Sequence, residues 1–195
     1  ILVLVLLFFW IRGFRSQQVL RQQRERDIKA SCPHYVIDAV FDPDKKTISA
    51  KQEISIQNNY GKELTELCFH LYPNAFISED MVPFPKNDLA VAYPEGFGPG
   101  KIDIKQVKTD FSPLKYQVKD TILKVFLPAP LAIGESLKVN IEFESFLPPS
   151  VGRFGYGKNT FNGGNWYPIL AVYENNQWRK DPYYAIRDPF YSETS

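Results

Sequence analysis

The feature that most constrains this sequence is a strict alternation of apolar and polar residues in two long segments. In "LKVNIEFESF" (137–146) every second residue from Leu137 to Phe143 is apolar, and the residues between them are polar. The segment "TISAKQEISIQN" (47–58) shows the same period. Its apolar positions on one face are Ile48, Ala50, Ile54 and Ile56. A period of two places alternate side chains on opposite faces of a β-strand, so both segments predict long, half-buried strands.

Five further segments have the composition of strands, and turn residues separate them. They are YVIDAVF (35–41), LTELCFHLY (64–72), KIDIKQVK (101–108), TILKVFLP (121–128) and WYPILAVY (166–173). The intervening DPDKK, NNYGK and APLAIGE segments hold the Pro, Asp, Asn and Gly residues that turns favour. No helical pattern follows Ser31, so we expect an all-β fold, an antiparallel sandwich, for residues 32–195. The longest irregular segment, 77–100, is expected to be a surface insertion between two strands.

The first 31 residues have a different character. Residues 1–11 are uninterruptedly apolar, but a membrane-spanning helix needs about 20 such residues. They predict a partial transmembrane segment, with Trp10 at its interfacial edge, or the core of a signal sequence. Residues 12–31 follow with six basic and two acidic side chains, which predicts a basic juxtamembrane helix or linker against anionic headgroups. The chain does not begin with Met, and we expect it to be part of a longer protein.

Charge and cysteine content exclude some functions and leave others open. The net charge is +1 and no basic face is evident, so the sequence offers no nucleic-acid surface. Cys32 and Cys68 are compatible with a disulfide in an oxidising compartment or with two separate thiols in strands. The two cysteines, with His34 and His70, are the Cys and His side chains that zinc could bind. Their spacing matches no compact structural zinc site.

No catalytic motif is present. Neither histidine lies beside a nucleophile elbow, and the GFGPG segment (96–100) precedes a strand instead of the helix that a phosphate loop needs. The remaining candidate is "RFGYGKNTFNGGNWYPILAVY" (153–173), in which glycines and the amides Asn159, Asn162 and Asn165 lie among aromatic residues. It indicates either a polar rim on an aromatic platform that faces a ligand or another domain, or aromatic packing at the end of a sandwich.

Four short motifs occur in an order and spacing that resemble a known family. They are FHLYPNAF (69–76), NWYP (165–168), DPYY (181–184) and DPFYSE (188–193). Together they resemble the N-terminal domain of zinc aminopeptidases of the aminopeptidase N family (gluzincins), from Tyr35 to Ser195. The resemblance implies a saddle-like β domain that precedes a thermolysin-like catalytic domain.

The resemblance also implies that this chain is not itself catalytic. The family's H-E-x-x-H and Gly-x-Met-Glu-Asn motifs are absent, because neither histidine precedes a Glu and the single Met81 precedes Val82. No catalytic residue, metal ligand or cofactor is therefore expected here, and zinc is expected in a catalytic domain after Ser195. In the family an acidic or amide residue of this domain helps hold the substrate's α-amino group, which implies substrate binding by Asn165, Asn162 or Asn159.

The expected role is to support the catalytic domain and to line the cleft for its peptide substrate. The expected partners are that domain, the peptide and, through residues 1–11, a membrane. Basic residues beside an apolar segment usually mark the cytoplasmic side, whereas the resemblance favours the outer face of the membrane. The alternative function is a binding module or subunit of a membrane or transporter complex whose parent protein lacks peptidase activity.

Overall fold

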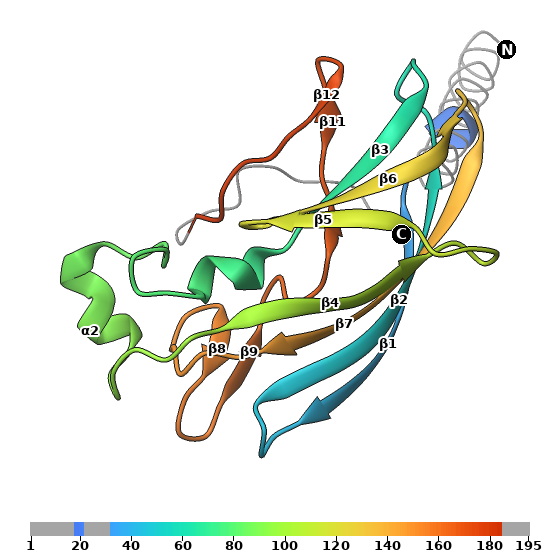
Figure 1. Ribbon diagram of the computed structural model, residues 1–195. Coiled ribbons are helices and arrows are strands. Elements are labelled where there is room, and N and C mark those ends of the chain that lie inside the picture. Colours follow the sequence, from blue (N-terminus) through green and yellow to red (C-terminus); the bar gives the residue numbers. More distant parts are fainter. Residues whose placement is uncertain (1–17, 22–31, 185–195) are drawn as a thin grey trace, which may run out of the picture.

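The structure is an antiparallel β-sandwich, seen in a computed structural model that describes residues 18–21 and 32–184 (Figure 1). The first sheet has the strand order β1-β2-β7-β4 and the second has the order β10-β3-β6-β5. The first consists of β1 (His34–Asp42), β2 (Thr47–Gln57), β7 (Ser136–Phe146) and β4 (Lys101–Lys108). The second consists of β10 (Ile169–Leu170), β3 (Leu64–His70), β6 (Ile122–Leu131) and β5 (Lys115–Lys119). The predicted all-β class is confirmed.

The alternating segments lie side by side in the first sheet. β2 and β7 pair antiparallel over their whole length, with Ile54 opposite Val139 and Ala50 opposite Phe143. Their apolar faces point into the sandwich, as the period of two predicts. Gln52 of β2 and Ser145 of β7 are exceptions on this face, since both are polar side chains that are almost fully buried.

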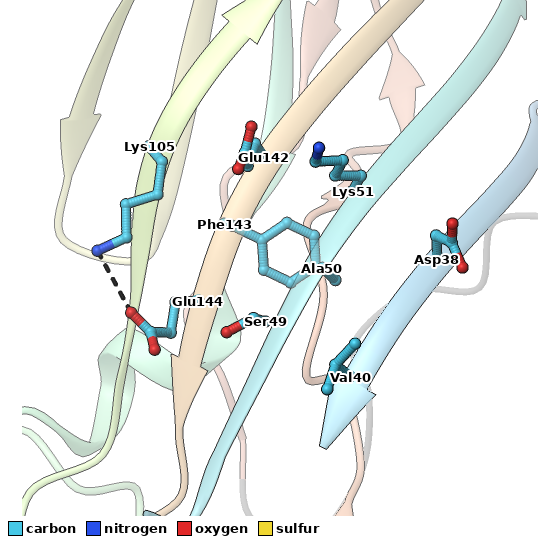
Figure 2. A pocket seen from close by; sticks show the side chains of 9 residues that line it. All are labelled: Asp38, Val40, Ser49, Ala50, Lys51, Lys105, Glu142, Phe143 and Glu144. Carbon is cyan, nitrogen blue, oxygen red and sulfur yellow. Dashed lines mark ion pairs between the residues drawn. The ribbon is translucent and has the colours of Figure 1, made fainter. Parts of the chain in front are cut away.

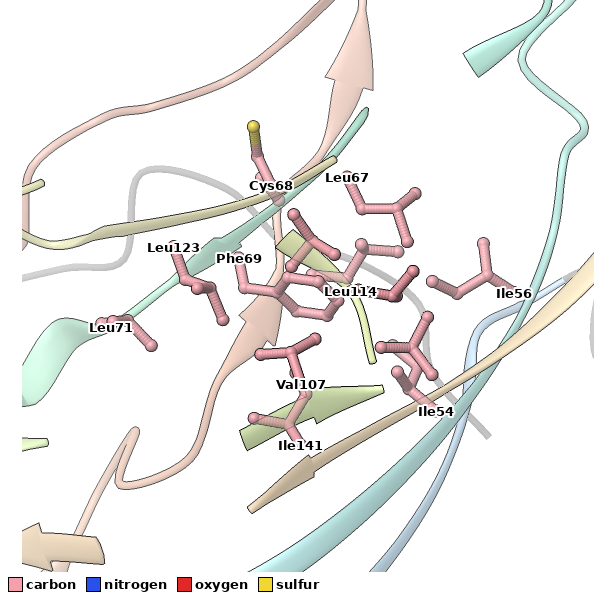
Figure 3. Packing of buried hydrophobic residues seen from close by; sticks show 14 of the residues in the cluster. Ile54, Ile56, Leu67, Cys68, Phe69, Leu71, Val107, Leu114, Leu123 and Ile141 are labelled. Carbon is pink, nitrogen blue, oxygen red and sulfur yellow. The ribbon is translucent and has the colours of Figure 1, made fainter. Parts of the chain in front are cut away.

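The core lies between the two sheets and consists mainly of aliphatic side chains around Phe69 (Figure 3). Ile54 and Ile141 come from the first sheet, and Leu67 and Leu123 come from the second. All four are at most 1% exposed. Burial of a Leu or Ile side chain stabilises a fold by about 1.5–3 kcal/mol, so this layer is the main source of stability.

Several small elements were not expected from the sequence. They are the hairpins β8 (Phe154–Tyr156)–β9 (Phe161–Gly163) and β11 (Tyr173–Glu174)–β12 (Gln177–Trp178), the 3₁₀ helices η1 (Tyr72–Phe76) and η2 (Lys86–Asp88), and α2 (Leu89–Ala92). The WYPILAVY segment is not one strand but contributes β10 and β11, separated by Ala171 and Val172. These elements are only two to five residues long, too short for a periodic signal to develop.

The two ends of the sandwich differ. The proximal end holds the start of β1 and the loops β2–β3 (58–63), β4–β5 (109–114) and β6–β7 (132–135). The distal end holds the β1–β2 turn, at the bottom of Figure 1, and the segment 71–100 and the β8–β9 hairpin, toward its left. The chain therefore enters its first strand at the end opposite to these distal elements.

Residues 1–11 lie outside the described part of the chain, as does all of 12–31 except the helical residues 18–21. Within 18–21 and 32–184, no helix has the length and apolar character needed to cross a membrane. The expectations for the first 31 residues therefore remain predictions.

Candidate functional site

Three of the four resemblance motifs meet at the distal end, although they lie far apart in the sequence. η1, which follows β3, carries Tyr72 and Phe76. The ring of Tyr183, from the DPYY motif, packs against both, with centroid separations of 5.4 Å and 5.6 Å. Ile169, next to the NWYP motif, pairs with His70 of β3. The three motif segments thus form one packing unit.

The buried part of this unit is here called the distal aromatic cluster. Its members are Tyr72, Ala75, Phe76, Ala92, Tyr93, Leu147, Phe154 and Tyr183. The Arg153 guanidinium lies 5.6 Å from the Tyr183 ring centroid and donates a hydrogen bond of 3.2 Å to the carbonyl of Tyr184. The last described residues are therefore tied to the distal end. Most aromatic rings around segment 153–173 pack into the domain. Phe161 and Tyr184 remain exposed.

His70 sits beside the cluster as a neutral packing residue. It is 4% exposed, and its ring stacks on Tyr72 at 4.8 Å with an interplanar angle of 8°. Burial lowers the pKa of His70 to about 4, and Asp181 opposes this effect only in part. Its Nδ1 makes no hydrogen bond within the described residues. At neutral pH it is thus uncharged, and its geometry is that of a stacked ring, not of a general base aimed at an open cleft.

The NWYP segment (165–168) is fixed to the inner face of the first sheet by two polar side chains. Gln52 Nε2 donates to the carbonyl of Pro168 at 3.0 Å. Ser145 Oγ donates to the carbonyl of Trp166 at 2.6 Å. These two hydrogen bonds take the place of strand pairing for this segment, which runs across the end of the core. The polar residue in the alternating pattern of β2 therefore has a structural role.

The β8–β9 hairpin depends on close backbone contacts. Gly155 has φ of +148°, and a Cβ there would lie 2.3 Å from the Ser150 carbonyl oxygen. The amide of Gly164 donates to the carbonyl of Arg153 at 2.7 Å. Only glycine can adopt the φ of Gly155 and also lie this close to the Ser150 carbonyl. The hairpin is therefore held in one arrangement.

The three predicted substrate-binding amides lie on this hairpin and its exit. Asn159 is exposed at the hairpin tip, between β8 and β9. Asn162 is half-buried in β9, and its Nδ2 donates to the carbonyl of Gly152 at 2.8 Å. Asn165 is half-buried with φ of +57°, directly before Trp166. The structure thus gathers the three in one region, and their role in binding a substrate stays a prediction.

A surface contact at the same end was missed by sequence reasoning. Lys46, in the β1–β2 turn, lies 5.1 Å from the ring centroid of Phe161 and 5.5 Å from that of Tyr156. Phe41 adds an edge-to-face contact with Phe161 at 4.8 Å. No local pattern connects residues 41–46 with 161, so only the tertiary fold reveals this group.

A shallow hollow of about 400 Å³ lies on the outer face of the first sheet (Figure 2). Its lining includes Asp38, Lys51 and Glu142, and Lys105 pairs with Glu144 at 3.4 Å. A second hollow of about 470 Å³ continues along the same face. Opposite charges alternate on it and the ion pair is exposed, so the face neither selects one sign of charge nor arranges a nucleophile with a base.

The described residues do not form a metal site, and the thiol of Cys68 is buried. No group of three or more His, Cys, Asp or Glu side chains in 18–21 and 32–184 is arranged to hold a metal ion. Cys32 and Cys68 do not form a disulfide with each other, and burial raises the pKa of Cys68 to about 11. A thiol with such a pKa is not a nucleophile at neutral pH. These residues do not fit a zinc centre, and no zinc chemistry is assigned to them.

Comparisons with known proteins found similarity only among solved structures. No family model matches the chain, and no curated protein matches it. An M1 zinc metallopeptidase from Deinococcus radiodurans is similar at 13% identity and a TM-score of 0.40, over 58% of this chain and 20% of that chain. A mutant of an M1 zinc metallopeptidase from the same organism, bound to a Tyr-Ser-Ala substrate, is similar at 13% identity and a TM-score of 0.44, over 70% and 28%. The chain thus spans less than a third of the proteins it matches, and the similarity concerns the fold alone.

Proposed function

We propose that this chain is the non-catalytic N-terminal β domain of a membrane-anchored zinc aminopeptidase-like protein. It would support the catalytic domain and form one wall of the peptide cleft. The observation that carries the proposal is the convergence of FHLYPNAF, NWYP and DPYY in one packing unit at the distal end. Motifs whose order and spacing resemble those of a family here also lie in one region of the structure.

The distal end is suited to meet a following domain. The last described residue, Tyr184, lies there and is bound by Arg153. Phe161, Tyr184 and Val151 keep between 42% and 51% of their side chains exposed in the same region. Aromatic side chains and Arg are enriched in the centres of protein interfaces. A domain that continues from Tyr184 would therefore find an apolar, aromatic contact surface close by.

Within such a contact, we expect Asn165 to bind the α-amino group of the substrate. A carboxamide oxygen accepts a hydrogen bond from an ammonium group, although a carboxylate would attract it more strongly. The hairpin that carries Asn165 is held by Gly155 and by the Gly164–Arg153 hydrogen bond. A rigid loop positions such a group at a low entropic cost.

The first test compares two forms of the protein. One form is residues 30–195 alone, and the other is the natural protein extended to its own C-terminus. We expect one bound zinc ion and hydrolysis of aminoacyl anilides only in the longer form. If neither form binds zinc, the aminopeptidase proposal is wrong. The alternative, a binding module or subunit of a membrane or transporter complex, would then account for the exposed distal end.

A second test addresses Asn165 in the longer form. Asn165→Gly removes the amide but still tolerates the positive φ, so the loop conformation is preserved. We expect a higher KM for substrates with a free amino group. Asn175→Gly, at an exposed position between β11 and β12 with φ of +51°, is the matched control and should leave KM unchanged. Equal KM values for Asn165→Gly and the unmodified enzyme would remove Asn165 from the cleft.

A further inference from the structure

The β4–β5 loop presents a phenylalanine almost wholly to solvent. The side chain of Phe111 is 97% exposed, more than any other large hydrophobic residue in the described chain. Ile133, at the tip of the β6–β7 loop, is 61% exposed. Both loops belong to the proximal end, and both project to the right of the molecule in Figure 1. Exposed apolar tips of this kind mark contact with a partner or a membrane.

The Phe111 loop is internally fixed. Thr109 Oγ1 accepts hydrogen bonds from the amides of Phe111 (3.2 Å) and Ser112 (3.1 Å). The amide of Thr109 donates to the carbonyl of Ser112 at 2.8 Å, and Asn140 Nδ2 donates to Asp110 Oδ1 at 3.1 Å. The loop therefore holds its aromatic tip outward, and the exposure of Phe111 is a property of the fold.

The Ile133 loop is held in place mainly by the buried residue Asn58. The Gly134 amide donates to the Asn58 carbonyl at 2.8 Å, and the Ala132 amide donates to Glu135 Oε2 at 2.8 Å. Asn58 Nδ2 also donates to the Leu131 carbonyl at 2.8 Å. Two separate, ordered loops thus place an apolar tip at the same end of the domain.

Basic side chains flank the aromatic tip. Lys108 ends β4 and Lys115 begins β5, on either side of the loop. Both are exposed, and neither forms an ion pair with another residue of the described chain. Lysine ammonium groups beside an apolar tip match a surface of anionic headgroups over an apolar layer.

The course of the chain favours a bilayer over a protein as the occupant of this end. β1 begins at the proximal end, and the sequence before it consists of the apolar residues 1–11 and the basic residues 12–31. Twenty residues span roughly 30 Å as a helix, so the loops lie within reach of a bilayer that holds residues 1–11. A protein partner at this end would have to share that position with the membrane.

We propose that the tips Phe111 and Ile133, flanked by Lys108 and Lys115, insert into the headgroup region of an anionic bilayer and set the domain's orientation. The proposal rests on the membrane anchoring in the proposed function and adds a second, tertiary contact to it. It places the distal end, with its hairpin and aromatic cluster, away from the lipid.

The test uses the full chain in vesicles of phosphatidylcholine and phosphatidylglycerol, in a Cys32→Ser background. Phe111→Cys is labelled with an environment-sensitive nitrobenzoxadiazole probe. Val91→Cys, on α2 at the distal end, is the matched control, because Val91 is also an exposed apolar residue, at 71%. At position 111 we expect spin-labelled lipid to quench the probe and iodide not to quench it. At position 91 we expect iodide to quench the probe and spin-labelled lipid not to quench it.

The outcomes separate the two proposals. If the chain floats with the vesicles but iodide quenches both probes equally, the insertion of Phe111 is wrong and anchoring stands. If the chain does not float, anchoring fails and insertion fails with it. Protection from iodide without quenching by lipid would assign the tip to a protein contact and overturn the lipid assignment.

A variant without a label gives an independent readout. Phe111→Ser removes an exposed side chain, so it should not unfold the domain. In vesicles we expect trypsin to cleave after Lys108 and Lys115 severalfold faster in this variant than in the unmodified chain. The two should be cleaved at equal rates in detergent solution. Equal rates in vesicles would contradict the proposal.

Discussion

Individual residues at the distal end are constrained by the backbone around them. Gly155 has a φ of +148° and approaches the Ser150 carbonyl so closely that no Cβ fits. His70 is enclosed by the fold and stacked on Tyr72. In both cases one side chain, or its absence, determines how closely the neighbouring chain can pack. Each leads to a measurable effect on stability.

Gly155→Ala should destabilise the domain by about 3 kcal/mol or more, because it combines an unfavourable φ with a steric clash. Urea unfolding followed by tryptophan fluorescence measures this loss. Gly61→Ala is the control, since Gly61 has φ of +78° but a Cβ there meets nothing within 4 Å. It should cost only about 1 kcal/mol, the penalty of the left-handed conformation. Equal losses would show that the contact with Ser150 is unimportant.

His70 should make the domain less stable in acid. Its folded pKa of about 4 lies below the ordinary value of 6.5, so the unfolded chain binds the proton more readily. Stability is thus unaffected above pH 6.5 and falls as the pH decreases from 6.5 toward 4. Between pH 7.5 and 4.5 the loss from this residue should be about 2 kcal/mol.

The check is a comparison with His70→Gln, which has no charge to gain at either pH. The difference in unfolding free energy between pH 7.5 and 4.5 should be smaller in the variant than in the unmodified domain. An unchanged difference would mean that other groups control the acid sensitivity.

At the scale of elements, two buried asparagines hold loops that no strand pairing connects. At the proximal end, Asn58 Nδ2 donates to the carbonyls of Lys62 and Leu131, both at 2.8 Å. At the distal end, Asn74 Oδ1 accepts from the amide of Ile102 at 2.9 Å, while its Nδ2 donates to a neighbouring turn carbonyl. A carboxamide offers a donor and an acceptor at once, so one side chain joins two elements.

Asn74→Ala should cost about 2 kcal/mol, because the amide of Ile102 is buried and would lose its partner. Denaturant unfolding measures the loss, and the crystal or NMR structure of the variant should show a displaced start of β4. Asn59→Ala is the control, because this exposed side chain contacts only the neighbouring Gln57. A loss in Asn74→Ala no greater than in Asn59→Ala would contradict a joining role.

At the scale of the whole molecule, stability is distributed unevenly. β2 lies between β1 and β7 and is paired on both sides. The segment 77–100 holds only a few turn hydrogen bonds and two very short helices. Regions with little pairing and few buried apolar contacts open at a lower free energy than central strands. Segment 77–100 should therefore open before the sandwich unfolds.

Hydrogen exchange with peptide-level mass spectrometry tests this order. Amides in 78–91 should exchange much faster than those of β2 and β7 under native conditions. In the natural full-length protein, exchange at the exposed distal surface around Phe161 should slow, because the proposed following domain would cover it. Protection of 78–91 equal to that of β2 would contradict the order of opening.

Much of the fold was predictable because its signals are local. The alternation of 47–58 and 137–146 determined two strands and their buried faces, since a period of two leaves one face for the core. Strands such as β5 and the hairpin β8–β9 were not predictable, because strands of three to five residues are too short for a periodic pattern to develop. The same holds for the break in WYPILAVY, where the pairing of Ile169 with His70 ends after two residues.

By itself the sequence determined the all-β class, the main strands, the absence of a catalytic motif and the candidate amides Asn159, Asn162 and Asn165. Only the tertiary structure decided that three motifs share the distal end, that Lys46 meets Phe161, and that Phe111 projects from the proximal end. The physical reason is that alternation is a property of neighbouring residues. Convergence and exposure depend instead on chain packing, which brings together residues more than a hundred positions apart.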